Sequence, residues 1–246
     1  MSSDQTTLEQ ILPLLQVRGF AYDTLRRTFL TEPTQDLLQT VSQVGFIEAF
    51  PFADESALIH EGVGKISKYL DNQDVLSEEV FNQLHWDYTR MFIGPYELKA
   101  PPWESAYLNK EHLLFQEETL NVRRAYLKYA FLPKDYGHEA DDHLGLELDF
   151  MYQLSELAKT KVNQQDVIGL IEVLEDQKAF LENHLLMWVP DFSKNMAENA
   201  QTQFYEGMAM ILAGFLELDL KALGELLDIT IKCSKLREVS NEWRTS

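Results

Sequence analysis

The sequence predicts an all-α fold, a single helical domain over residues 1–246 with about ten to twelve helices. Apolar residues recur at three- and four-residue spacing along nearly the whole chain, and no run of strand length alternates β-branched with polar residues. Glycine and proline divide this pattern into segments of helix length. With 246 residues, 45% of them hydrophobic, the chain is long enough to bury a substantial core.

Capping and breaking residues delimit the helices of the N-terminal third. Thr6 and Thr7 offer the first N-cap, and Gly19 offers a break between the first helix and the second. The boundaries that follow are Pro33, Gly45, Pro51, and Asp54 or Ser56 as the cap of a helix that runs to about residue 70.

A helix over 77–93 has the clearest amphipathic pattern. Its apolar residues form one stripe, and Trp86 and Arg90 point away from that stripe. Gly94 and Pro95 end the helix, and two consecutive prolines stiffen the loop that follows. The stripe consists of Phe81, Leu84, Tyr88, Met91 and Phe92, and further helices are expected over 115–129, 142–158, 166–188 and 201–218, with a last one towards residue 237.

The segment 142–158 has apolar residues on two faces, which predicts a central, buried helix. The polar run GHEADDH, residues 137–143, precedes it. We expect this run to form the turn and the N-cap, with Asp141 or Asp142 accepting from free backbone N–H groups. A metal site built from His138, Asp141, Asp142 and His143 is a weaker alternative, because the spacing does not match His-Glu-x-x-His.

Composition and charge disfavour several classes of partner. The chain has 21 Lys and Arg against 40 Asp and Glu, a net charge of -19, which disfavours nucleic acid and anionic membranes and favours a basic peptide. Solubility alone explains the charge equally well. No apolar stretch approaches the roughly 20 residues of a membrane span. The N-terminus has no secretory-signal pattern, and Cys233 is the single cysteine, so we expect the chain to stay where it is made.

No catalytic, metal-binding or cofactor-binding residue is assigned, because each motif tested is incomplete. The run EGVGKIS, residues 61–67, lacks the first glycine and the hydroxyl residue of a phosphate loop and is interpreted as a helix with two glycines. Cys233 has no nearby histidine in the sequence and is interpreted as a packed thiol. The Glu-x-x-His pairs of a di-iron bundle are absent from the sequence.

Aromatic residues and prolines cluster beside acids around the loop 94–107. Rigid side chains of this kind suit the binding of an extended peptide. Packing of the same side chains into the core explains the cluster equally well. The cluster consists of Tyr96, Pro101, Pro102, Trp103 and Tyr107.

Three sequence elements occur in the order found in one known family. The run RMFIGPYELKAPPWESAYL, residues 90–108, resembles the signature of the TorD/DmsD family of redox-enzyme maturation chaperones, in wording closest to the DmsD branch. HEADDHLGLELDFM, residues 138–151, resembles that family's Glu-Pro-x-Asp-His motif, carried here by Glu139, Asp142 and His143 with Ala140 in place of the proline. HLLMWVPDF and FYEGMAMILAGF, residues 184–192 and 204–215, resemble its aromatic pattern before the closing helices.

The resemblance implies a cytoplasmic, all-helical chaperone that is not an enzyme and has no cofactor of its own. Its implied partners are the twin-arginine signal peptide and the precursor of a molybdopterin-dependent oxidoreductase of the dimethyl sulfoxide reductase type, and beyond these the components of the twin-arginine translocase. Neither nucleic acid nor membrane insertion is implied. The chaperone would assist cofactor insertion and folding before export. The alternative is a structural subunit or a nucleotide-binding assembly factor of a redox enzyme complex.

The resemblance also implies ten candidate peptide-binding residues. Aromatic residues and proline would supply apolar contact, and acids would supply charge-assisted hydrogen bonds to guanidinium groups. For some candidates an interpretation without peptide stays open: burial of Tyr88 and Phe92 on the core stripe, orientation of Asp142 by His143, and capping of the next turn by Ser105. The candidates are Tyr88, Phe92, Tyr96, Pro102, Trp103, Glu104, Ser105, Glu139, Asp142 and His143.

Overall fold

The computed structural model describes residues 8–72, 74, 76–95, 97–108, 117–132 and 139–245, with side chains to residue 236. Within these ranges the chain forms nine continuous helical segments and no β-strand, which confirms the all-α prediction with slightly fewer helices than expected. Thr6, Thr7, Tyr96 and His138 lie outside the described residues. The elements are α2 (Leu12–Phe29), α3 (Gln35–Val41), α4 (Ala57–Asp71), α5 (Glu78–Tyr88), the π-helix η1 (Thr89–Ile93), α6 (Ser105–Leu108), α7 (Glu117–Lys128), α8 (Leu144–Asn163), α9 (Val167–Phe180), the π-helix η2 (Leu181–Leu185), α10 (Leu186–Asn199) and α11 (Gln203–Thr245).

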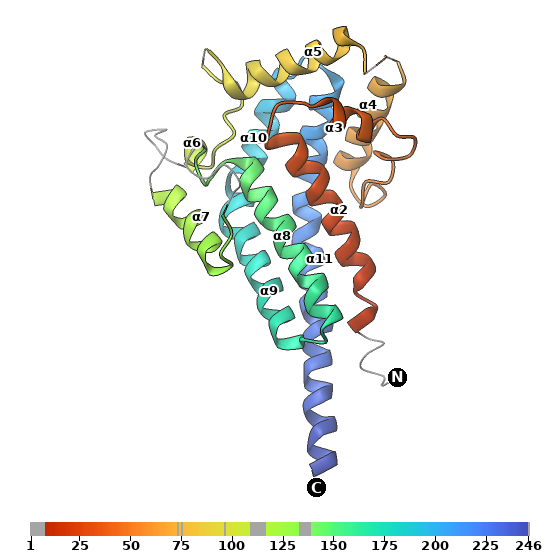
Figure 1. The fold of residues 1–246 in the computed structure, drawn as a ribbon, viewed down its shortest axis with the longest axis vertical. Coiled ribbons are helices and arrows are strands. Elements are labelled where there is room, and N and C mark those ends of the chain that lie inside the picture. Colours follow the sequence, from red (N-terminus) through yellow and green to blue (C-terminus); the bar gives the residue numbers. More distant parts are fainter. Residues whose placement is uncertain are drawn as a thin grey trace.

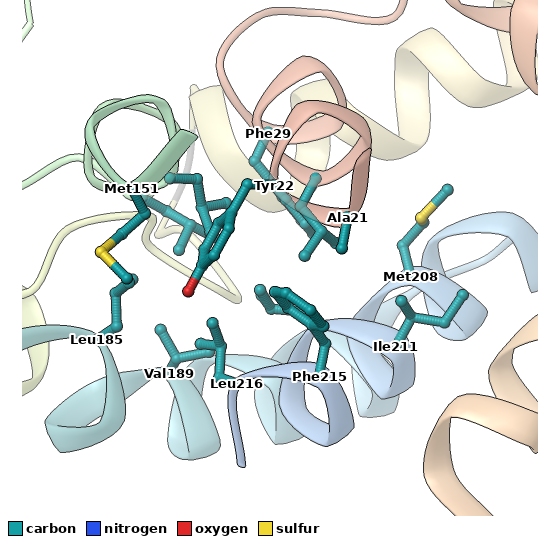
Figure 2. Close-up of a cluster of buried hydrophobic side chains, with 14 of the residues drawn as sticks. Ala21, Tyr22, Phe29, Met151, Leu185, Val189, Met208, Ile211, Phe215 and Leu216 are labelled. Atoms are coloured by element: carbon teal, nitrogen blue, oxygen red, sulfur yellow. The ribbon is translucent and has the colours of Figure 1, made fainter. Parts of the chain in front are cut away.

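Helix α11 runs the length of the molecule, and α2, α8 and α9 lie along it while α5 crosses one end (Figure 1). Helix α11 packs mainly on α4, α9 and α10, and α2 packs mainly on α8. Their apolar side chains meet in one core, where the rings of Tyr22 of α2 and Phe215 of α11 are in edge contact and Met151 of α8 lies beside Leu185 of η2 (Figure 2). Helix α8 is buried on both faces, as its two apolar faces predict.

A fully buried ion pair crosses this core. The Arg18 guanidinium donates to both carboxylate oxygens of Asp219, at 2.5 and 3.0 Å, and to the side-chain oxygen of Gln177 at 3.1 Å. The Tyr22 hydroxyl donates to Asp219 at 2.7 Å. Because every charge in the group has a hydrogen-bonded partner, the pair fixes α2, α9 and α11 in one relative register.

A second buried carboxylate joins α5 to the start of α11. Asp87 accepts hydrogen bonds from the backbone N–H groups of Gln201 and Thr202 and from the Thr202 hydroxyl. Arg90 donates to Asp87 at 2.7 Å and to the Asn199 carbonyl at 2.6 Å. Asp87 lies on the neighbouring helix α5 and satisfies the free backbone N–H groups that precede α11.

Three expected breaks are wrong, because packing outweighs local helix-breaking signals. Gly19 lies inside the continuous helix α2, where it packs against Glu156 of α8. The expected helix 166–188 continues through η2 and α10 to Asn199, with Pro190 inside it. A proline costs a helix about 3 kcal/mol, which the burial of Trp188, Val189 and Phe192 offsets. The two expected C-terminal helices form the single helix α11.

Other sequence expectations hold. Ser56, rather than Asp54, caps α4, and Ser77 caps α5. Residues 61–67 lie inside α4, where a Cβ on Gly62 would come within 2.6 Å of the Gly207 carbonyl oxygen, so this glycine allows α4 to approach α11. Cys233 is buried. None of the described helices combines the length and the apolar character needed to cross a bilayer.

Candidate functional site

The loop 97–104 and the segment 139–143 cross in front of α8. Trp103 and His143 form an isolated antiparallel bridge. The Leu144 N–H donates to the Pro102 carbonyl at 2.8 Å, and the Glu104 N–H donates to the Asp142 carbonyl at 3.0 Å. The structure thus brings together two of the sequence elements that carry the family resemblance, although more than 30 residues separate them in the sequence.

Asp142 uses its carboxylate inside the protein. It is fully buried, and its two oxygens accept from the Ser105 backbone N–H and from the Thr119 hydroxyl, both at 2.9 Å. Asp142 therefore binds the start of α6 and holds α7 next to it. The expectation that Asp141 or Asp142 caps α8 is wrong, because both side chains turn to other elements: Asp141 accepts from Arg123 of α7.

His143 is the N-cap of α8. Its Nδ1 accepts the Gly145 N–H at 3.1 Å, and its ring lies edge-on to Trp103 with centroids 5.9 Å apart. Burial lowers the pKa of His143, against the opposing charges of Glu139 and Asp142, so the imidazole is neutral and can accept this bond. His143 thus holds the helix start and the indole together.

Glu139 is the exposed carboxylate among the candidates. The Trp103 indole N–H donates to Glu139 Oε1 at 2.8 Å, and the Ala140 N–H donates to the same oxygen at 3.1 Å. Within the described ranges the second carboxylate oxygen has no hydrogen bond or ion pair. Among the described residues, Glu139 is therefore oriented by two donors and keeps one carboxylate oxygen available to an external donor.

A cavity of about 740 Å³ opens beside Trp103. Its lining includes Leu98, Pro101, Trp103 and Tyr107 from the loop and α6, and Asn195 from α10. Burial raises the pKa of Tyr107 to about 12. A hydrogen bond with Asn195 lowers this pKa, and the negative charge of Asp191 raises it further. The lining of the cavity is thus mostly apolar, and its polar groups include the neutral phenol of Tyr107, the amide of Asn195, and the charged side chains of Glu97 and Lys99.

Three buried acids, Glu104, Asp142 and Glu147, lie near one another beneath this loop. Glu104 is 2% exposed, and the His184 imidazole lies 3.0 Å from its Oε2. Burial, repulsion from Glu104 and Asp142, and a hydrogen bond with Glu104 raise the pKa of Glu147 well above its usual value. The protonated form of Glu147 is therefore favoured, and the Trp188 indole N–H donates to Glu147 Oε2 at 3.3 Å.

Tyr88 and Phe92 lie in the core under the loop. Their rings are in edge contact at 4.8 Å, and the Tyr88 hydroxyl donates to the Phe29 carbonyl at 3.2 Å. Phe92 also stacks on Phe192 of α10. Pro102 and Ser105 are buried as well. Seven of the nine described candidates are therefore buried and support the loop from within the protein. They are Tyr88, Phe92, Pro102, Glu104, Ser105, Asp142 and His143.

The sequence candidates did not include the inner residues Glu147, His184 and Trp188. Glu147 had a detectable signal, since it is a lone acid among the apolar residues LGLELDFM of a buried helix. His184 lies in the π-helix η2, and its approach to Glu104 depends on a tertiary contact across 80 residues. In the described part of the chain no group of three or more His, Cys, Asp or Glu side chains is arranged to hold a metal ion.

Comparison with known proteins finds one matching family model and several similar chaperones. A family model described as nitrate reductase delta subunit matches residues 53–194, more than half of the chain. The chain is 28% identical to chaperone protein TorD of Vibrio vulnificus over 217 residues, 86% of this chain and 97% of that protein. It is 26% identical to chaperone protein TorD of Aliivibrio fischeri over 75% of this chain and 86% of that protein.

A member of the other branch also matches, over a shorter stretch. The Tat proofreading chaperone DmsD of Salmonella typhi is 29% identical over 122 residues, 50% of this chain and 53% of that protein. The expected likeness to the DmsD branch stays a prediction, because the TorD relatives match more of the chain. The relatives are named as chaperones and not as enzymes. The chain belongs to the TorD/DmsD family of redox-enzyme maturation chaperones.

Proposed function

We propose that the chain is a cytoplasmic chaperone that binds the twin-arginine signal peptide of a molybdoenzyme catalytic subunit of the dimethyl sulfoxide reductase type. It holds the precursor while the cofactor is inserted and before export, when translocase components become further partners. The observation that carries the proposal is the mostly apolar cavity beside Trp103, together with the hydrogen bond from the Trp103 indole to the exposed carboxylate of Glu139. An apolar leader stretch fits the cavity, and an arginine fits the carboxylate.

We assign direct peptide contact to Trp103 and Glu139. Trp103 supplies a rigid apolar wall at low entropic cost, and Glu139 offers a carboxylate that two protein donors already orient. The buried candidates act from within. Asp142 and His143 hold the backbone that presents the two contact residues, so their substitution weakens peptide binding by disturbing the site.

Titration calorimetry with the client's leader peptide tests the assignment. Trp103→Ala and Glu139→Gln are each expected to weaken binding about tenfold or more, the scale of one aromatic anchor or one charge-assisted pair. The matched control is Glu225→Gln, an exposed acid on α11 that is expected to leave the affinity unchanged. A peptide with Lys-Lys in place of Arg-Arg is expected to bind less tightly, because ammonium groups cannot form a bidentate contact.

The outcomes separate the parts of the proposal. No heat from any leader at micromolar concentrations contradicts leader binding as a whole. Equal affinity for the two peptides removes the role of the guanidinium groups. Affinity that does not fall as salt concentration rises contradicts the contribution of the net charge of -19.

A structural subunit of a redox complex is the second candidate, and the description of the matching family model as a delta subunit favours it. Affinity capture from the source cells, followed by N-terminal sequencing of the captured proteins, distinguishes the two. Precursors that carry twin-arginine leaders and are released again support the chaperone. Permanent, stoichiometric capture of one mature enzyme supports the subunit.

A further inference from the structure

Helix α5 crosses one end of the molecule (Figure 1), and a second cavity is lined by residues of α5 and of the segment before α11. Its volume is about 470 Å³, and it shares no lining residue with the cavity beside Trp103. It is lined by Glu79, Asn82, Gln83 and Trp86 of α5, and by Gln201 and Thr202 before α11.

The walls of this cavity carry open binding groups. Trp86 is 64% exposed, and its ring contact within the described residues is an edge contact with His85. The side chains of Glu79, Asn82, Gln83 and Gln201 are exposed and have no hydrogen bond or ion pair in the part of the chain that the structure describes. The cavity thus presents one indole face, one carboxylate and three primary amides.

The charge of the cavity selects against an anion. The N–H groups of Gln201 and Thr202, which would otherwise attract one, already donate to the buried Asp87. Nη2 of Arg90 donates to the same carboxylate and to the Asn199 carbonyl, and Arg90 is not among the residues that line the cavity. Among the described residues no lysine or arginine lines the cavity, whereas Glu79 does. A cationic occupant is therefore favoured.

We propose that this cavity binds an arginine side chain in an extended segment of a partner polypeptide. The guanidinium plane stacks on Trp86 and donates two hydrogen bonds to Glu79, a geometry that a lysine ammonium cannot reproduce. The amides of Asn82 and Gln83 hydrogen-bond the peptide backbone on either side of the arginine. The inference is independent of leader binding at Trp103, because the two cavities have different walls.

The test uses acetyl-Gly-Arg-Gly-amide as the probe and the full chain labelled with ¹⁵N. The indole N–H resonance of Trp86, assigned with the variant Trp86→Phe, is expected to shift and saturate. Glu79→Gln is expected to weaken binding about threefold, the scale of an exposed charged contact. Glu78→Gln is the matched control, because it changes the same helical turn but does not line the cavity, and it is expected to leave binding unchanged.

Two further arms complete the design. Acetyl-Gly-Lys-Gly-amide is expected to bind about threefold more weakly or worse than the arginine peptide. Trp103→Ala is expected to leave the Trp86 response intact. The proposal is overturned if the shift does not saturate, if lysine and arginine bind equally, if Glu78→Gln and Glu79→Gln cause the same loss, or if Trp103→Ala abolishes the response.

Discussion

Replacing Glu147 with glutamine is expected to stabilise the protein by an amount that grows with pH. Burial, and then repulsion from Glu104 and Asp142, raise the pKa of folded Glu147 well above 4.5, so the folded carboxyl keeps a proton that the unfolded chain releases. The stabilising contribution of such a group is present below pH 4.5 and is lost as pH rises toward the folded pKa. Each pH unit between the unfolded and the folded pKa of Glu147 costs the folded state about 1.4 kcal/mol.

Glutamine removes this cost and keeps the contacts. Its amide oxygen can accept from the Trp188 indole, as Glu147 does, and its NH₂ group can donate to Glu104. Urea unfolding of both proteins at about pH 5.5 and about pH 6.5 measures the difference, which is expected to rise by about 1.4 kcal/mol. Glu225→Gln, exposed on α11, should show no such slope. A difference for Glu147→Gln that is constant with pH would show an ionised Glu147 in the folded state and refute the reasoning.

Three other substitutions test the packing by urea unfolding. Asp142→Ala strands the Ser105 N–H and the Thr119 hydroxyl and should cost about 3 kcal/mol, of which Asp142→Asn recovers part; equal losses would contradict the hydrogen-bond account. Asp219→Leu leaves the Arg18 charge buried alone and should cost about 3 to 5 kcal/mol, and the double variant with Arg18→Met should restore most of it. Gly62→Ala should cost about 1 to 3 kcal/mol because its Cβ meets the Gly207 carbonyl, whereas Gly64→Ala, with open space around it, should be neutral or stabilising.

The helical fold could be predicted from local signals, and the wrongly predicted helix breaks have one physical cause. Hydroxyl caps at Ser56 and Ser77 and the apolar stripe on 77–93 are local, and the structure confirms them. Gly19 and Pro190 are also local signals, yet both lie inside continuous helices. A single breaking residue costs a helix about 1 to 3 kcal/mol, and the burial of one or two large side chains is enough to offset it.

The candidate site could be predicted only in part, because burial of a polar group depends on contacts between distant segments. The motif residues Glu139 and Asp142 are three residues apart and chemically alike, but one carboxylate is exposed and the other is fully buried. The difference arises from where the start of α6 lies, since the Ser105 N–H reaches Asp142. Likewise, the meeting of Glu104 with Glu147 joins two segments whose proximity no sequence pattern records.

Residues of the candidate site have two different roles, contact with the peptide and support of the loop, and mutations must distinguish them. Loss of peptide binding in Asp142→Asn does not identify Asp142 as a contact residue, because the substitution weakens the internal hydrogen bonds that hold α6 and α7. Glu139 is different: its exposed carboxylate has an oxygen without a partner in the described residues. Measuring affinity and unfolding free energy on the same variants separates the two roles. A contact residue lowers affinity at nearly constant stability, whereas a supporting residue lowers both together.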